Sequence, residues 1–73
     1  MNETTHNIII YTQDLKILNK IKSFFRKRHM LVDGGYLVVS NYTEIQVFLY
    51  ENNIKGQLEN KGKTLSWLLI DKK

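Results

Sequence analysis

Basic side chains are the first candidates for chemistry in this sequence, because they gather in one segment. Between Asp14 and Asp33 there is no acidic residue, and six cations fill the interval: Lys16, Lys20, Lys22, Arg26, Lys27 and Arg28. If the segment is helical, these cations form two adjacent rows, with Lys16, Lys20 and Lys27 in one and Lys22 and Arg26 in the other. Such rows can follow a phosphate backbone and release counterions on binding. We therefore predict a binding site for nucleic acid, or for a protein with an acidic surface. A solvated helix face is the alternative, because lysine is a good helix former.

Four polar residues form a second candidate site. Thr12 and Gln13 end one predicted strand, and Ser40 and Asn41 end the next. If these two strands are parallel, both pairs lie at the same edge of the sheet. Open α/β sheets bind ligands at that edge, and helix N-termini favour anions there. Ordinary helix capping is the alternative explanation for the same residues.

The residues that most enzymes use are absent or scattered. The chain has no cysteine, which excludes disulfides, thiolate nucleophiles and thiolate metal ligands. His6 and His29 lie at opposite ends of the first strand–helix unit, without further ligands at metal-binding spacing. The seven carboxylates are widely spaced, so no acid–base pair can be nominated. We expect a protein that is not an enzyme, with no catalytic residue, metal or cofactor, and two surface histidines.

The first half of the chain is predicted to form a strand, a helix and a second strand. Residues 7–12 are apolar on both faces, which is typical of a strand that is covered on both sides. Residues 13–29 carry apolar residues at helical spacing, with Leu18, Ile21 and Phe25 in the buried stripe. A turn at 33–35 then leads into a strand at 36–40, again apolar on both faces. The 34 or so residues of this unit suit a right-handed crossover between parallel strands.

The second half is predicted to form a helix and a hairpin. Asn41 and Glu44 match a capping box, which favours a helix over 42–52, although alternating apolar residues leave a strand there as the alternative. Residues 54–59 and 63–70 flank a short loop and read as an edge strand and a central strand. The predicted fold is therefore α/β or α+β, in the order β-α-β-α-β-β, with two helices packed on one mixed sheet.

The length and composition predict one small cytoplasmic domain. With 73 residues and 42% hydrophobic content, the chain suits a single domain over residues 1–73, with a flexible N-terminus at 1–6. No secretory signal or membrane-length apolar segment is evident, so we expect no membrane contact and a cytoplasmic location, in a bacterium or an infected host cell. The residues expected in the core are Ile9, Leu18, Ile21, Phe25, Val38, Phe48 and Trp67, with Trp67 packed under a helix.

These features predict a small, non-catalytic accessory or regulatory protein. The net charge of +4 and the basic helix favour binding to nucleic acid, or to a complex that handles it. The alternative is a protein-only regulator or inhibitor that docks on its partner by a sheet edge or an aromatic patch, with Tyr42 and Tyr50 exposed. A small domain without disulfide or metal, and with a free edge near 54–59, also suggests a homodimer or a larger partner.

Overall fold

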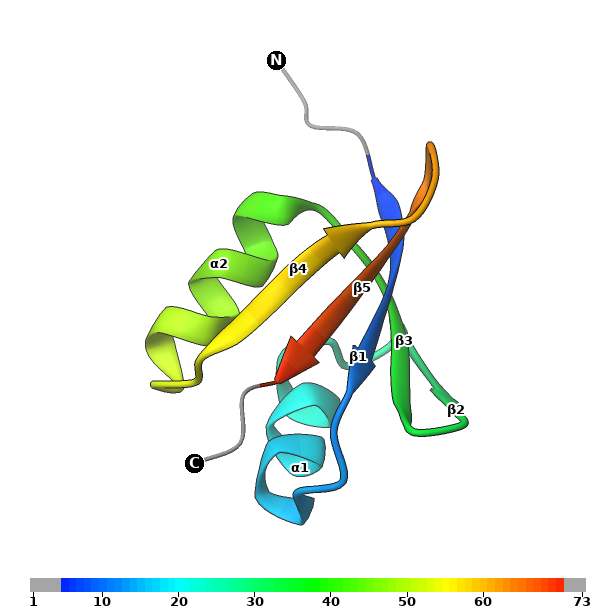
Figure 1. The fold of residues 1–73 in the computed structure, drawn as a ribbon. Coiled ribbons are helices and arrows are strands. Elements are labelled where there is room, and N and C mark those ends of the chain that lie inside the picture. Colours follow the sequence, from blue (N-terminus) through cyan, green and yellow to red (C-terminus); the bar gives the residue numbers. More distant parts are fainter. Residues whose placement is uncertain (1–4, 71–73) are drawn as a thin grey trace.

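A computed structural model describes residues 5–70 as one mixed five-stranded sheet, with both helices on the same face (Figure 1). In chain order, the elements are β1 (His6–Tyr11), α1 (Leu15–Phe24), β2 (His29–Val32), β3 (Gly35–Ser40), α2 (Tyr42–Glu51), β4 (Gly56–Asn60) and β5 (Leu65–Ile70). The predicted class, one small α+β domain with two helices on a mixed sheet, is confirmed. Residues 1–4 of the predicted flexible N-terminus lie outside the described residues, and His6 already belongs to β1.

The strands lie in the order β2-β3-β1-β5-β4, and only β1 and β5 pair in parallel. The β4–β5 hairpin places β4 at one edge of the sheet and β5 inside it, as the sequence predicted. β2 forms the other edge and was not predicted. Of its four residues, His29 was assigned to the end of the first helix, and residues 30–32 were assigned to no element.

Helix α1 is shorter than predicted, because it ends at Phe24 and not at residue 29. Phe25 is fully buried, and the N–H of Arg28 bonds to the Phe25 carbonyl oxygen at 3.0 Å, which closes a turn after the helix. The following residues then pair with β3, with Met30 opposite Leu37. Pairing with a neighbouring strand outweighs the helical propensity of the basic segment.

The hairpin of β2 and β3 reverses the strand direction that the sequence predicted. β1 and β3 are antiparallel, with Ile8 opposite Val38, so the predicted parallel crossover between them is wrong. The chain instead crosses through α1 from β1 to β2. These two strands run in the same direction, and β3 lies between them.

Helix α2 confirms the helix predicted over 42–52 and excludes the strand alternative. The Asn41 side chain caps the helix by accepting a hydrogen bond from the Glu44 N–H at 2.8 Å. The chain leaves the helix through Asn53, whose φ of 56° is in the left-handed region that asparagine tolerates.

The core lies between the sheet and the two helices. Its buried hydrophobic residues are Ile8, Ile10, Ile21, Phe25, Val38, Ile45, Phe48, Leu49 and Leu68. Ile21, Phe25, Val38 and Phe48 confirm the core prediction, and Leu18 is half-buried against them. The prediction is wrong for Ile9 and Trp67, which lie on the opposite face of the sheet.

Candidate protein interface

The sheet has a second face, which no element of residues 5–70 covers (Figure 1). Side chains alternate along a strand, and residues paired across strands share a face. Because Ile8 and Ile10 point to the helices, their odd-numbered neighbours and the partners of these neighbours point away. We call this surface the open face. Its hydrophobic residues are Ile9, Tyr11, Met30, Val32, Leu37, Val39, Leu65, Trp67 and Leu69.

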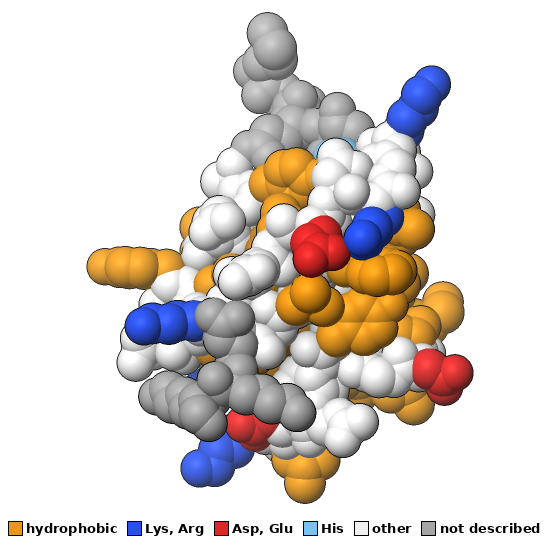
Figure 2. Space-filling model, in the orientation of Figure 1, with side chains coloured by type: hydrophobic (Ala, Val, Ile, Leu, Met, Phe, Trp, Pro, Cys, Tyr) orange, Lys and Arg blue, Asp and Glu red, His pale blue; other side chains and the backbone are white. Residues whose placement is uncertain are grey.

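The open face is apolar and solvent-accessible. Figure 2 shows hydrophobic side chains gathered over the strands on this side of the molecule. Met30 is 63% exposed and Val39 is 40% exposed. Ile9 and Leu37 are half-buried although no helix lies above them, so they are shielded mainly by their neighbours on the sheet. A contiguous apolar surface of this kind marks an interaction site more often than a free protein surface.

Trp67 lies on β5, between its paired residues Ile9 on β1 and Glu59 on β4. Its ring meets Tyr11 edge to face, with centroids 5.5 Å apart. The Lys61 Nζ lies 4.5 Å from the centroid of the Trp67 ring and 3.1 Å from the Glu59 carboxylate. Lys61, which lies against the Trp67 ring on this face, is therefore paired with a carboxylate on the same face.

The six predicted cations do not form the predicted rows. Lys16, Lys20 and Lys22 lie on α1, whereas Arg26 and Lys27 follow it in a turn. Because α1 ends at Phe24, the helix keeps Lys16 and Lys20 four residues apart but no longer aligns Lys27 with them or Arg26 with Lys22. Two residues correspond to about 200° of helix rotation, so Lys22 projects about 160° away from Lys20.

Arg28 is bound within the fold and is not a free cation. Its Nη1 and Nη2 donate to the two carboxylate oxygens of Glu44 at 2.8 and 2.6 Å, and the Ser40 hydroxyl donates to the same carboxylate at 2.6 Å. The hydrogen bonds from Arg28 hold the pKa of Glu44 below its ordinary value, and those from Ser40 act in the same direction. The pKa of Arg28 is raised by the same pair.

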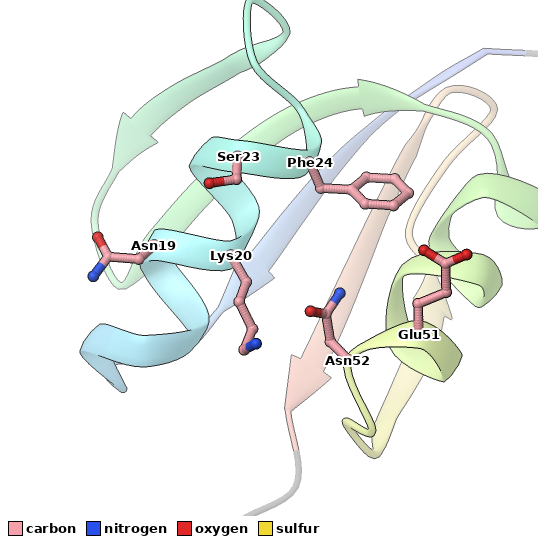
Figure 3. A pocket seen from close by; sticks show the side chains of 6 residues that line it. All are labelled: Asn19, Lys20, Ser23, Phe24, Glu51 and Asn52. Carbon is pink, nitrogen blue, oxygen red and sulfur yellow. The ribbon is translucent and has the colours of Figure 1, made fainter.

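Lys20 lies in an open groove between α1 and the end of α2 (Figure 3). The groove is lined by Asn19, Lys20, Ser23, Phe24, Glu51 and Asn52. The Asn52 side-chain amide donates to the Phe48 carbonyl oxygen at 2.9 Å, so it serves to end the helix. The groove contains one of the six predicted cations and does not bring the others together.

The second predicted site is wrong, because the antiparallel pairing separates its two halves. Tyr11 pairs with Gly35 and His6 with Ser40, so Thr12 and Gln13 lie at one end of the sheet and Ser40 and Asn41 at the other. The first pair starts α1, where Thr12 Oγ1 accepts from the Asp14 N–H at 3.2 Å. Ser40 and Asn41 fix the start of α2 through Glu44. Ordinary capping explains these residues.

Most of the tyrosines and histidines considered as binding residues make contacts within the domain. Tyr42 was expected to be exposed, but it is half-buried: its hydroxyl lies 2.8 Å from the Ser66 Oγ, and its ring stacks on His6. Tyr50 is exposed, as predicted. His6 and His29 are half-buried rather than on the surface. No group of three metal ligands occurs in residues 5–70, and neither helix in that range is long and apolar enough to cross a membrane.

Comparison of the chain with protein-family models, curated proteins and solved structures finds no match. The open face is the candidate surface that the geometry offers. One signal in the sequence pointed to it, because the strands at 7–12, 36–40 and 63–70 are apolar on both faces. The helices of residues 5–70 cover only one of these faces.

Proposed function

We propose that the protein is a non-catalytic protein-binding module that docks through its open face on an apolar, uncharged surface of a protein partner. The observation that carries this proposal is the group of nine hydrophobic side chains that residues 5–70 place on the face of the sheet opposite the helices. Burial of apolar surface is the main favourable term in protein association, and aromatic anchors such as Trp67 are enriched at binding hot spots.

The charge of the open face also favours a protein partner over nucleic acid. Phosphate backbones are bound by unpaired lysine and arginine, whereas the cation on this face, Lys61, is paired with Glu59. Sheet faces with hydrophobic side chains on every second residue pack against apolar layers of other elements. An apolar protein surface therefore satisfies this face, and a phosphate backbone does not.

Nucleic-acid binding is the second candidate, and it rests on a different surface. Lys16, Lys20, Lys22, Arg26 and Lys27 are exposed and form no ion pair within residues 5–70. They lie on α1 and in the turn after it, on the helical side of the sheet. Their distribution around the helix weakens a single track along a phosphate backbone, but unpaired cations still support salt-sensitive binding.

Two valines of equal exposure test the proposed function. Val39 lies on the open face and is 40% exposed, whereas Val47 lies on α2 and is 41% exposed. The tagged full chain and its Val39→Lys and Val47→Lys variants are used to capture proteins from cells that naturally make the protein, with nuclease present. We expect Val39→Lys to reduce capture about tenfold or more, because it buries an unpaired charge in the interface, and Val47→Lys to leave it unchanged.

The same experiment separates the two candidate functions. Capture that survives nuclease and about 0.5 M salt but is lost in Val39→Lys supports the open face as the docking surface. Capture that disappears with nuclease or salt, and that Val39→Lys leaves intact, overturns this proposal in favour of nucleic-acid binding. In that case the double reversal Lys20→Glu with Lys27→Glu should abolish the interaction.

A further inference from the structure

We infer that the occupant of the open face is a second copy of this chain, so that two sheets pack face to face with the helices outside. This inference rests on the proposed function, because it names the partner of the same surface. Domains are built from layers that bury their apolar faces against one another, and a sheet whose second face is apolar needs such a layer. Face-to-face sheets pack about 10 Å apart, with their strands close to aligned.

The charge distribution of the chain permits this contact. Two copies with a net charge of +4 each repel one another if their cations meet. The helical side carries Lys16, Lys20 and Lys22, whereas the open face carries the neutral pair of Lys61 and Glu59. Contact through the open face therefore keeps the basic helices on the two outer sides and brings uncharged apolar surfaces together.

The size of the face also fits a weak dimer. Five strands about 4.8 Å apart, with about five residues each at about 3.3 Å, give a projected area on the order of 400 Å² per copy. Stable interfaces bury about 800 Å² of accessible surface per partner, and transient ones bury less. Projecting side chains such as those of Met30 and Trp67 add to this area, and we expect the dimer to be weak.

The small size of the domain suggests that binding a second copy also stabilises the fold. Within residues 5–70 the core contains nine buried hydrophobic residues, and the chain has no cysteine that could form a disulfide. Small domains with such cores are commonly completed by oligomerisation. A second copy is always available as a partner, because it is present wherever the chain itself is made.

The test is sedimentation of the full chain from about 5 to about 500 µM, with the emission of Trp67 followed in parallel. Four variants are compared. Val39→Lys and Met30→Lys change the open face, whereas Val47→Lys and Leu31→Lys are their matched controls. Met30 and Leu31 are adjacent on β2, are 63% and 73% exposed, and point to opposite faces of the sheet. Circular dichroism verifies that each variant is folded.

We expect the mass of the wild type to rise towards twice 8.7 kDa with concentration, while Trp67 emission shifts to shorter wavelength as its ring leaves water. The open-face variants should raise the dissociation constant at least about tenfold, and the controls should leave it within about twofold. A wild-type monomer at every concentration would overturn the second copy as partner. Face-dependent capture of another protein would still support the proposed function. A dimer that the open-face variants leave intact, or that the controls weaken equally, uses another surface and also overturns the inference.

Discussion

Arg28 shows how a single residue can change role when its neighbours in space are known. In the sequence it is one of six cations without a nearby acid, but in the structure it joins the start of β2 to the start of α2 through Glu44. A two-pronged guanidinium–carboxylate contact fixes orientation as well as contributing energy. The guanidinium carbon also lies 5.5 Å from the centroid of the Phe25 ring, above the core. These contacts hold the turn after α1 against the start of α2.

Replacing Glu44 with glutamine should destabilise the protein in a pH-dependent way. At neutral pH we expect Glu44→Gln to lower the free energy of unfolding by about 0.5–1.5 kcal/mol, a modest value because the pair is partly exposed to solvent. The folded-state pKa of Glu44 is lowered, so its contribution is complete above the unfolded-state pKa of about 4.3 and is lost as the pH falls through the folded value. Urea denaturation of both proteins at pH 7 and pH 3 measures this difference, which should shrink at pH 3. An equal difference at both pH values would contradict a role for the carboxylate charge.

At the scale of elements, the periodicity of apolar residues identified most helices and strands but not which strands pair or in which direction they run. The strands at β1, β3 and β5 and both helices follow from alternating or helical apolar spacing. β2 was missed because the helical pattern was extended to His29, and no proline or glycine separates the helix from the strand. That four-residue strand reversed the direction of β3 and so removed the second predicted site. The open face was visible only as strands that are apolar on both sides, because the spacing of residues shows that a face is apolar and not what covers it.

Gly35 is the residue on which the contact between β3 and β1 depends. A Cβ at this position would lie 1.8 Å from the Ile10 carbonyl oxygen, so the backbone of β1 would have to move. We expect Gly35→Ala to lower the free energy of unfolding by about 1–3 kcal/mol or more. Gly62, in the β4–β5 loop, is the matched control, since a Cβ there meets only the Leu65 Cβ at 4.0 Å. Gly62→Ala should change stability by no more than about 0.5 kcal/mol in the same urea titration. Equal effects of the two substitutions would show that β3 can move away from β1 without cost.

At the scale of the whole molecule, helices cover one face of the sheet, and no element of residues 5–70 covers the other. The helices, Phe25, Phe48 and the ion pair of Arg28 and Glu44 complete the first side. The second side has hydrophobic residues in the positions of a core but, in residues 5–70, no layer above them. The cations lie mainly on the first side, so charge and apolar surface are segregated between the two faces of the sheet. In the proposed contact through the open face, this segregation leaves the basic side in solvent.

If a second copy completes the fold, thermal stability must depend on protein concentration. A partner that binds only the folded chain raises the free energy of unfolding by about 1.4 kcal/mol when its concentration is about ten times the dissociation constant. For a domain of this size, each 1 kcal/mol shifts Tm by about 4–8 °C, so we expect a rise of about 5–10 °C between dilute and concentrated samples. Val39→Lys should melt at one temperature over the whole range, because its charge on the open face prevents association, whereas Val47→Lys should follow the wild type. Melting curves recorded by circular dichroism over a hundredfold range of concentration measure this, and a wild-type Tm that does not change would show that the single sheet with its two helices is stable alone.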